Sequence, residues 1–375
     1  MSSLYIHIPF CLSKCHYCSF SSFVASKFQY DQYIGAVKGE LLQLLEREGE
    51  LILDTLFIGG GTPTCLPVFQ LKELLHQCFS NYQVTPEAEI SIEANPGTVN
   101  ENYLEELLEC GVNRLSLGIQ SFDDGELGAL GRRHNKMQAC GAVKAAQHVG
   151  FKNINLDLMY GLPEQNSASW QRSLGHGLSL GPTHLSLYQL TIESDTLFGK
   201  RVEQGDLALP GEEEVLLMDA VTADLCREGG FSRYETSNYS RDGFRCRHNI
   251  NYWRNDDYYA VGAGAVSFLR GVREKRIADP ARYVRLSYQK NSVVSEREQL
   301  TREESFRETV IMGLRMDEGV SREALLRRYE IDMEHYYGST LEKLLQDGFV
   351  ELTDSHLRIS PKGWPLSNRI MAELV

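Results

Sequence analysis

The sequence predicts an α/β fold in which helices cover a sheet of parallel strands. Short apolar stretches alternate six times with longer stretches whose apolar residues recur at helical spacing, and this alternation is typical of parallel sheets. Glycines and polar residues stand where several of the short stretches end, at the edge where parallel sheets build their sites. The 375 residues, 42% hydrophobic and 24% charged, are enough for one large domain and a smaller one.

The predicted strands and helices follow one another in pairs along the chain. Each strand is a short apolar run, and each following helix is recognised by its apolar periodicity. In order, the pairs are 4–8 with 30–48, 54–61 with 66–79, 88–96 with 100–111, 113–122 with 137–150, 153–163 with 167–178, and 184–194 with 213–230.

The ends of the predicted strands carry candidate site residues. The glycines at 59–61, Glu93, Gln120 and Asp157 all fall at or just after the end of an apolar strand. Each alone can be an ordinary turn residue between a strand and a helix. Their alignment along one edge of the sheet favours a shared binding site instead.

The chain divides into three predicted regions, which are 1–232, 233–300 and 301–375. The first contains the strand–helix units, and the second begins with a loop-like, aromatic stretch. The third has helices followed by a hairpin, which is typical of a winged-helix module. Acidic residues outnumber basic ones in this last region, so a lid packed on the barrel is favoured over a DNA-reading domain.

Charge and cysteine usage restrict the class of protein. Thirty-eight Lys and Arg face 51 Asp and Glu, for a net charge of −13, which argues against a nucleic acid partner. No apolar run reaches the roughly 20 residues of a membrane span, so we expect a cytoplasmic protein. Six of the nine cysteines are scattered singly, as reduced thiols of an intracellular chain are.

The remaining three cysteines, Cys11, Cys15 and Cys18, form a CxxxCxxC motif after the first predicted strand. Three thiolates in one short loop suit a soft metal centre. Zinc would need a fourth ligand such as His7 or His16, and a buried helical face is a further alternative. A 4Fe-4S cluster held by three cysteines would keep one iron open to a small molecule, and this is the interpretation we favour.

This motif resembles the signature of the radical S-adenosylmethionine (radical SAM) superfamily. The resemblance implies a partial (β/α)6 barrel whose open iron binds S-adenosylmethionine, and an electron from the cluster then cleaves the cofactor's sulfonium bond. The glycines of "FIGGGTPT", 57–64, let the backbone approach a ligand. A phosphate-binding loop would continue with Gly-Lys-Ser/Thr, which is absent here, and the glycines of 261–268 are predicted to form a turn.

Further motifs resemble one branch of the superfamily, which contains oxygen-independent coproporphyrinogen III dehydrogenase and the HemW-type heme chaperones. These motifs are "YIHIPFCLSKCHYCSF", "GGGTPT", "IEANP", "LSLGIQSF", "LGRRHN" and "NLDLMYGLP". The resemblance implies that Tyr5, Gly60 and Glu93 contact the cluster-bound S-adenosylmethionine. It also implies an adjacent site, which holds a second S-adenosylmethionine in the dehydrogenase, lined by Tyr17, Gly61, Thr62, Gln120, Arg132 and Asp157.

Two departures separate this chain from the dehydrogenase. The dehydrogenase has a further cysteine two places after the motif, where this chain has Phe20. It also has an N-terminal extension, whereas the first strand here is reached by Leu4.

The segment "HNINYW", 248–253, matches the HNxxYW motif of HemW-type proteins. Histidine is a usual axial ligand of heme iron, so His248 is the predicted heme ligand and Cys246 the alternative.

The sequence therefore predicts a heme chaperone that carries a 4Fe-4S cluster and S-adenosylmethionine and passes heme to acceptor proteins. The alternative is a radical SAM enzyme that acts on a porphyrin, such as the dehydrogenase itself. Phe20 and His248 favour the chaperone. Productive cleavage of S-adenosylmethionine, binding of a second molecule of it, a homodimer and a transient contact with a membrane surface are left open.

Overall fold

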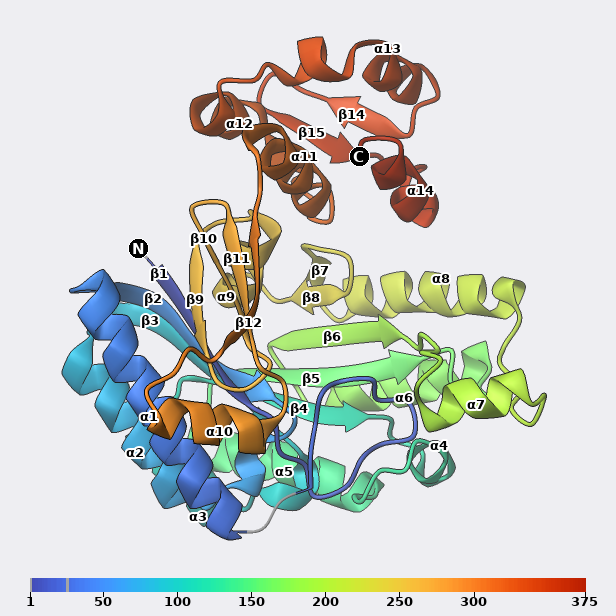
Figure 1. Cartoon of the computed structure of the whole chain (residues 1–375). Helices are drawn as coiled ribbons and strands as arrows, with labels where there is room; N and C mark the ends of the chain where they lie inside the picture. The colour runs from blue at the N-terminus through green and yellow to red at the C-terminus, as the bar shows by residue number, and fades with distance from the viewer. Residues whose placement is uncertain (1, 25–26) are drawn as a thin grey trace.

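The structure is a computed structural model that describes residues 2–24 and 27–375. Its centre is a curved sheet of six parallel strands in sequential order, as Figure 1 shows. The strands are β1 (Ser2–Ile8), β2 (Ile52–Gly60), β3 (Gln83–Ala94), β4 (Arg114–Gln120), β5 (Asn153–Tyr160) and β6 (His184–Gln189). All six predicted strands are therefore confirmed, and their order is that of a partial barrel.

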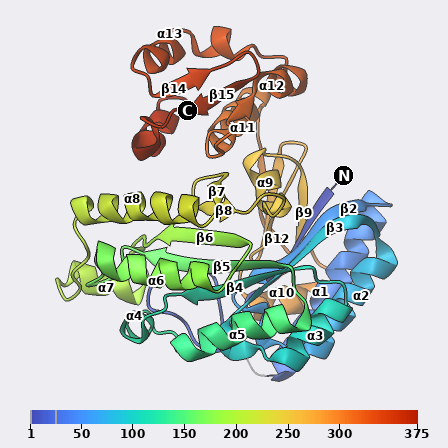
Figure 2. The same cartoon turned by 180° about the vertical axis from the view of Figure 1, so that it is seen from behind.

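Helices cover the outer face of this sheet (Figure 2). They are α1 (Lys27–Glu48), α2 (Val68–Asn81), α3 (Glu101–Glu109), α5 (Lys136–Val149), α6 (Ser167–Ser179) and α8 (Glu212–Glu228). The short helices α4 (Asp124–Ala129) and α7 (Leu197–Glu203) lie at the C-terminal ends of the strands (Figure 1), and short 3-10 turns, η1 (Pro63–Cys65) and η2 (Pro96–Thr98), follow β2 and β3. Polar side chains fix where they begin: Asn135 and Asn166 each accept a backbone N–H in a capping box at α5 and α6. Leucines, valines and isoleucines of strands and helices form one large core between them.

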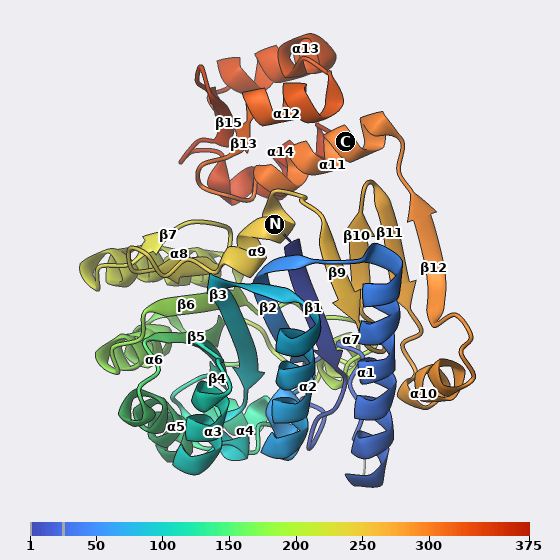
Figure 3. The same ribbon diagram turned by 90° about the vertical axis from the view of Figure 1, so that its left-hand side faces the viewer.

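The region 233–300 is more ordered than its loop-like composition indicates. It contains β7 (Ser232–Arg233), β8 (Asn238–Ser240), α9 (Arg247–Trp253), β9 (Tyr258–Val261), β10 (Val266–Leu269), β11 (Val272–Arg276), α10 (Pro280–Tyr288) and β12 (Val294–Gln299). These strands extend both edges of the sheet, β9 next to β1 and β8 next to β6, as Figure 3 shows for the β9 side. Strands this short carry no readable alternation, which is why the prediction of a loop-like stretch over 234–268 was wrong.

A buried ion pair joins this extension to α1. Arg276 donates from Nε to Glu40 Oε1 at 2.9 Å, and both side chains are almost fully buried, at 3% and 8% exposure. The other carboxylate oxygen accepts the Tyr283 hydroxyl at 2.6 Å and the Gly262 N–H at 2.9 Å. Gly262 has φ 102°, a left-handed conformation that turns the chain between β9 and β10, as the glycine-rich sequence predicts.

The C-terminal region forms its own small core beside the barrel. It contains α11 (Arg302–Gly313), β13 (Val320–Ser321), α12 (Arg322–Tyr329), α13 (Met333–Gln346), β14 (Val350–Leu352), β15 (His356–Ile359), η3 (Trp364–Leu366) and α14 (Ser367–Ala372). The three strands pair in the order β13-β15-β14, which with α11, α12 and α13 gives the winged-helix-like arrangement that the sequence predicts. No helix in the described parts of the chain is long and apolar enough to cross a bilayer.

Polar contacts connect this C-terminal region to the rest of the molecule. The Asn255 amide donates to Glu308 and to Thr309 of α11, at 3.3 and 3.0 Å. Arg233 pairs with Asp317 at 3.0 Å. Figures 1 and 3 both show the region seated over α9, at one end of the sheet.

Candidate functional site

A cavity of about 680 Å³ lies at the C-terminal ends of the parallel strands. It brings together eleven of the predicted site residues, from loops and strands far apart in the sequence. They are Cys11, Cys15, Tyr17, Cys18, Gly60, Gly61, Thr62, Glu93, Gln120, Arg132 and Asp157. The parallel topology explains the convergence, because the C-terminal ends of all six strands meet at one edge.

The three cysteines follow β1 in a loop that the backbone holds against the sheet. The Cys11 N–H donates to Phe23 O at 3.0 Å, and the Thr62 N–H donates to Phe10 O at 2.7 Å. The His16 N–H donates to Leu130 O at 3.0 Å, which ties the loop to the end of α4 (Figure 1). These bonds fix the direction in which the thiols enter the cavity.

Two polar side chains stand beside the thiols of the motif, and burial affects one of the thiols. Arg132 donates from Nη1 to Cys15 Sγ at 3.5 Å, and Thr62 Oγ1 lies 3.6 Å from Cys11 Sγ. Burial raises the pKa of Cys18, and the neighbouring Cys15 and Cys11 add to the rise. Among the described residues no three His, Cys, Asp or Glu side chains surround a single metal-ion position.

The glycines at the end of β2 make room for a ligand beside the thiols. A Cβ on Gly61 would lie 2.6 Å from Phe10 O and 3.0 Å from Cys11 Sγ, so no side chain fits there. Gly60 has φ 121°, and its N–H donates to Glu93 Oε2 at 2.9 Å. This cradle of bare backbone next to three thiols fits a 4Fe-4S cluster with a small ligand on its open iron.

Two carboxyl groups face the cavity from neighbouring strands. Burial is the main cause that raises the pKa of Glu93 to about 7; Asp157 adds to the rise, and the Gly60 N–H and Arg114 oppose it. Burial likewise raises the pKa of Asp157, against hydrogen bonds from Asn155 and Ser116. The Asn155 amide donates to Asp157 Oδ1 at 2.7 Å. Both carboxyl groups can accept hydrogen bonds from the amine or ribose of a cofactor.

Arg132 forms the cationic side of the same cavity. Its Nη2 donates to Gly118 O at 2.6 Å and to the side-chain oxygen of Asn95, while its buried Nε has no hydrogen-bond partner in the described chain. Gln120 has φ 69°, a strained conformation for a side chain with a Cβ. The Gly118 carbonyl holds Arg132 in place, and the guanidinium can donate hydrogen bonds to a carboxylate ligand.

Several cavity residues were not singled out by the sequence analysis. They are Asn95, Arg114, Ser116, Asn155, Ser186 and Tyr188. Asn95 belongs to the quoted "IEANP" motif. Ser116 and Asn155 lie two residues before Gly118 and Asp157 on their strands, and the two-residue period of a strand puts such neighbours on one face. That periodicity was the signal that could have found them.

Tyr5 is the one predicted S-adenosylmethionine contact that does not line this cavity. It lines a neighbouring cavity of about 660 Å³ with His7, Asn249, Tyr252, Trp253 and residues of α11. Tyr188 and Asn249 border both cavities, so the two spaces share a wall. The HNxxYW segment forms α9 and lies between the barrel and α11.

His248 is buried within α9 instead of facing either cavity. Its ring is 1% exposed overall, with Nδ1 2.7 Å from Thr55 Oγ1 and Nε2 2.9 Å from Tyr252 Oη. Burial lowers the pKa of His248 to about 3, and Arg114 adds to the decrease. Both ring nitrogens are thus engaged, and ligation of heme by His248 would require these hydrogen bonds to break.

The alternative heme ligand, Cys246, is also enclosed. It is 0% exposed, and its Sγ donates to Glu89 at 3.4 Å. Burial raises the pKa of this thiol to about 12, against the opposing effect of Arg114. Glu89 also accepts the backbone N–H of Arg247 at 2.9 Å, so Cys246 and Glu89 together fix the start of α9.

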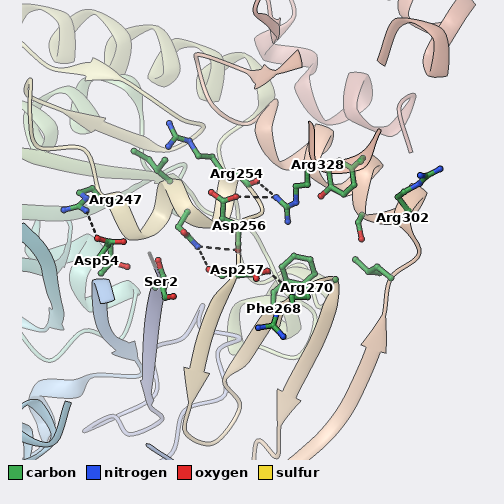
Figure 4. Close-up of a pocket in the computed structure, with 18 residues that line it drawn as sticks. Ser2, Asp54, Arg247, Arg254, Asp256, Asp257, Phe268, Arg270, Arg302 and Arg328 are labelled. Carbon is green, nitrogen blue, oxygen red and sulfur yellow. Dashed lines mark hydrogen bonds and ion pairs between the residues drawn. The ribbon is translucent and has the colours of Figure 1, made fainter. Parts of the chain in front are cut away.

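A third cavity, of about 880 Å³, lies on the other side of α9, at the N-terminal ends of β1 and β2. Figure 4 shows that arginines and aspartates line it. Arg328 pairs with Asp256 at 3.4 Å, and Arg247 lies 4.0 Å from Asp54. Its charges are largely paired, and it is remote from the cysteine loop.

Comparison with family models and comparison with solved structures both relate this chain to radical SAM proteins. The family model for the radical SAM superfamily matches residues 5–175, and that for the HemN C-terminal domain matches residues 300–366. The structure is similar to coproporphyrinogen III oxidase HemN from Escherichia coli, a radical SAM enzyme, with a TM-score of 0.87 and 24% identity over 99% of this chain and 89% of that one. This likeness confirms the predicted fold.

Curated relatives are more similar still in sequence. The heme chaperone HemW of Bacillus subtilis is 34% identical over 99% of this chain and 98% of its own length. The heme chaperone HemW of Escherichia coli is 40% identical over 70% of this chain and 69% of its own length. With the superfamily cysteines, the glycine cradle and the HNxxYW helix all present, the chain belongs to the HemW family within the radical SAM superfamily.

Proposed function

We propose that this protein is a heme chaperone, which binds heme and delivers it to acceptor haemoproteins. The observation that carries the proposal is the similarity over nearly the whole length, 99% of this chain and 98% of the relative, to a protein named heme chaperone HemW. The aromatic cavity beside the cysteine site supports it, because Tyr5, Tyr252 and Trp253 line a space in which a flat apolar ring can pack.

The cysteine cavity holds the resident cofactors in this proposal. Cys11, Cys15 and Cys18 would hold the 4Fe-4S cluster, and the glycine cradle with Glu93 would hold S-adenosylmethionine on the open iron. Together these two groups supply one-electron chemistry when bound. The protein's part is to orient the ligand and to keep water away from the thiols.

The remaining cavity residues position charge around this ligand. Arg132 offers donors to a carboxylate and holds Cys15 by a hydrogen bond to its sulfur. Asp157 is fixed by Asn155 and Ser116, so it can accept a hydrogen bond without moving. Tyr17, Thr62 and Gln120 complete the wall, and a second S-adenosylmethionine at this wall remains a prediction.

The dehydrogenase alternative is not favoured. Phe20 stands where the dehydrogenase has a further cysteine, and it is 69% exposed at the rim of the cysteine cavity. A phenyl ring offers no sulfur at this position. The chain therefore lacks one feature of the enzyme while it keeps the cofactor site.

The partners in this proposal are heme and proteins that accept it. The net charge of −13 supports the view that the partner is not nucleic acid, and a cytoplasmic location is part of the proposal. A homodimer and a transient contact with a membrane surface stay open as arrangements for delivery.

Heme transfer tests the delivery step. The heme-loaded protein is mixed with a heme-free haemoprotein at increasing concentration, and the acceptor's absorption band is followed with time. Direct delivery predicts a transfer rate that rises with acceptor concentration, because the two proteins must meet. A rate that stays constant at every concentration would mean simple dissociation of heme, and the chaperone proposal would then be wrong.

A further inference from the structure

One short segment of chain joins the C-terminal region to the rest of the molecule. Residues 300 and 301 lead from the end of β12 to the start of α11, as Figure 3 shows. Both sides of this connection are fixed, because the Leu300 N–H donates to Gly271 O at 2.9 Å and Thr301 caps α11. A connection of two residues between two ordered elements can act as a hinge, since a few backbone angles absorb the whole rotation.

The C-terminal region and the barrel have separate apolar cores. Among the described residues, the large core ends at Val293 and the smaller core begins at Phe306. Each core is complete without the other, so the hydrophobic effect opposes separation of the two parts only weakly. The contact between them depends on other interactions.

Ion pairs with partly exposed side chains supply this contact. Asp317 pairs with Arg233 at 3.0 Å. Glu318 pairs with Arg254 at 3.1 Å and lies 3.9 Å from Arg245. All five side chains are between 29% and 56% exposed, and pairs with this exposure are weak and are screened by salt. A polar contact of this kind permits two parts of a chain to move relative to each other.

Asp317 and Glu318, which we call the latch, hold the side of the C-terminal region that is far from the connection. Arg233 lies in β7 and Arg254 directly follows α9. Figure 3 shows β7 and β12 on opposite sides of the molecule, and they form the two edges of the sheet. A rotation about residues 300 and 301 would therefore separate the latch from its arginines.

Two cavities lie along the same contact, one on each side of α9. Side chains of the barrel and of α11 line the cavity of about 660 Å³. The cavity of about 880 Å³ (Figure 4) has walls from the barrel, α11 and α12. Well-packed interiors contain few voids larger than a water molecule, so this contact is packed more loosely than either core.

We propose that the C-terminal region is a lid, which opens by rotation about residues 300 and 301 and is held closed by the latch. The opening itself goes beyond the proposed function and does not depend on it. A second step rests on the proposed function, and in this step the open lid admits heme.

The closed lid covers the aromatic wall that the proposed function assigns to heme. Tyr252 and Trp253 line the 660 Å³ cavity from α9, and Met312 lines it from α11. Arg315, which follows α11, has its guanidinium carbon 5.7 Å from the Trp253 ring centroid. Opening the lid exposes this wall, and closing it encloses what is bound there.

Hydrogen exchange, followed by mass spectrometry on the anaerobically reconstituted protein, measures the opening. The latch variant is Asp317→Asn with Glu318→Gln, which removes both charges and keeps hydrogen-bond acceptors in place. Glu323→Gln with Glu330→Gln is the matched control. It also removes two carboxylates from the C-terminal region, but their arginine partners lie within that region.

Exchange in residues 314–319 reports the opening directly, because the Asp317 N–H donates to Tyr234 O across the contact at 3.0 Å. After correction for intrinsic rates, the latch variant should exchange there about five- to tenfold faster than wild type. High salt should accelerate the same exchange in wild type, because it screens the ion pairs. Exchange within α13 should stay unchanged, since the lid opens without unfolding, and the control variant should behave as wild type does.

The rate of hemin uptake, measured by absorption at one salt concentration, tests the second step. The latch variant should take up hemin about fivefold faster than wild type, whereas the control variant, which has the same net charge as the latch variant, should match wild type. Faster exchange in the latch variant with unchanged uptake would overturn this step.

The outcomes keep the lid and the proposed function apart. If wild type and both variants exchange alike at every salt concentration, the lid inference is wrong and the chaperone function stands. If exchange in α13 rises together with that in residues 314–319, the region unfolds instead of opening, and the lid inference is also wrong. If wild-type protein binds no hemin, the proposed function and the second step fail, and the exchange data alone decide whether the lid opens.

Discussion

The protonation of Glu93 gives a sharp prediction about the cofactor cavity. Its pKa rises from 4.5 to about 7, mainly because the carboxyl is buried and also because Asp157 is near. Between these two pH values the folded protein keeps a proton that the unfolded chain has lost. Stability therefore decreases as pH rises through this window, and the decrease is complete above about pH 7.

The size of the effect follows from the change in proton affinity. A tenfold change in proton affinity corresponds to about 1.4 kcal/mol, so the rise in the pKa of Glu93 corresponds to about 3 kcal/mol for a fully enclosed carboxyl. Glu93 borders a cavity, and water there screens its charge, so about 2 kcal/mol is the better expectation. Glu93→Gln keeps an acceptor for the Gly60 N–H but cannot ionise, so it should be more stable than wild type at high pH.

Urea unfolding of the cluster-free protein between pH 5 and pH 8.5 measures this difference. The stability advantage of Glu93→Gln should grow from less than about 1 kcal/mol at pH 5 to about 2 kcal/mol at pH 8. Glu105→Gln, on the exposed face of α3, is the control for the loss of one carboxylate. If the two glutamine variants show the same pH profile relative to wild type, Glu93 does not carry a raised pKa and the reasoning fails.

Three further predictions concern the cluster and the frame around the cavities. Replacing any one of the three loop cysteines by alanine should remove most cluster iron and sulfide after anaerobic reconstitution, whereas full content in the triple variant would refute the assignment. Arg276→Ala leaves the Glu40 carboxylate buried and unpaired, so urea unfolding should show a loss of about 3–5 kcal/mol; a loss under about 1 kcal/mol would contradict it. His248→Ala removes the buried partner of Thr55 and should cost about 2–4 kcal/mol by the same assay, and unchanged stability would show that His248 is not a structural residue.

The order of strands and helices could be predicted because each element is long and strongly patterned. The six strands of the barrel are continuous apolar runs, and the cysteine motif stands directly after the first of them. Because the strands are parallel, their C-terminal ends all meet at one edge. The sequence alone could therefore assign Glu93, Gln120 and Asp157 to one cavity with the cysteines. The structure confirms that convergence.

The second cavity could not be predicted, because its walls depend on tertiary contacts between short elements. β9 and β10 have four residues each, too few to show a period. The burial of His248 depends on contacts with Thr55 and Tyr252. Thr55 is far from His248 in the sequence, so no local sequence pattern indicates that contact. His7 alternates with buried neighbours on β1, so its inward direction was readable.

One measurement tests the central claim most directly. The anaerobically reconstituted protein is given hemin and coproporphyrinogen III in parallel samples, and bound heme, cluster iron and porphyrin products are counted. A heme chaperone of this architecture should bind about one heme per chain while it keeps its 4Fe-4S cluster, and it should form no decarboxylated porphyrin. Rapid coproporphyrinogen turnover without measurable heme binding would contradict the account and restore the dehydrogenase alternative.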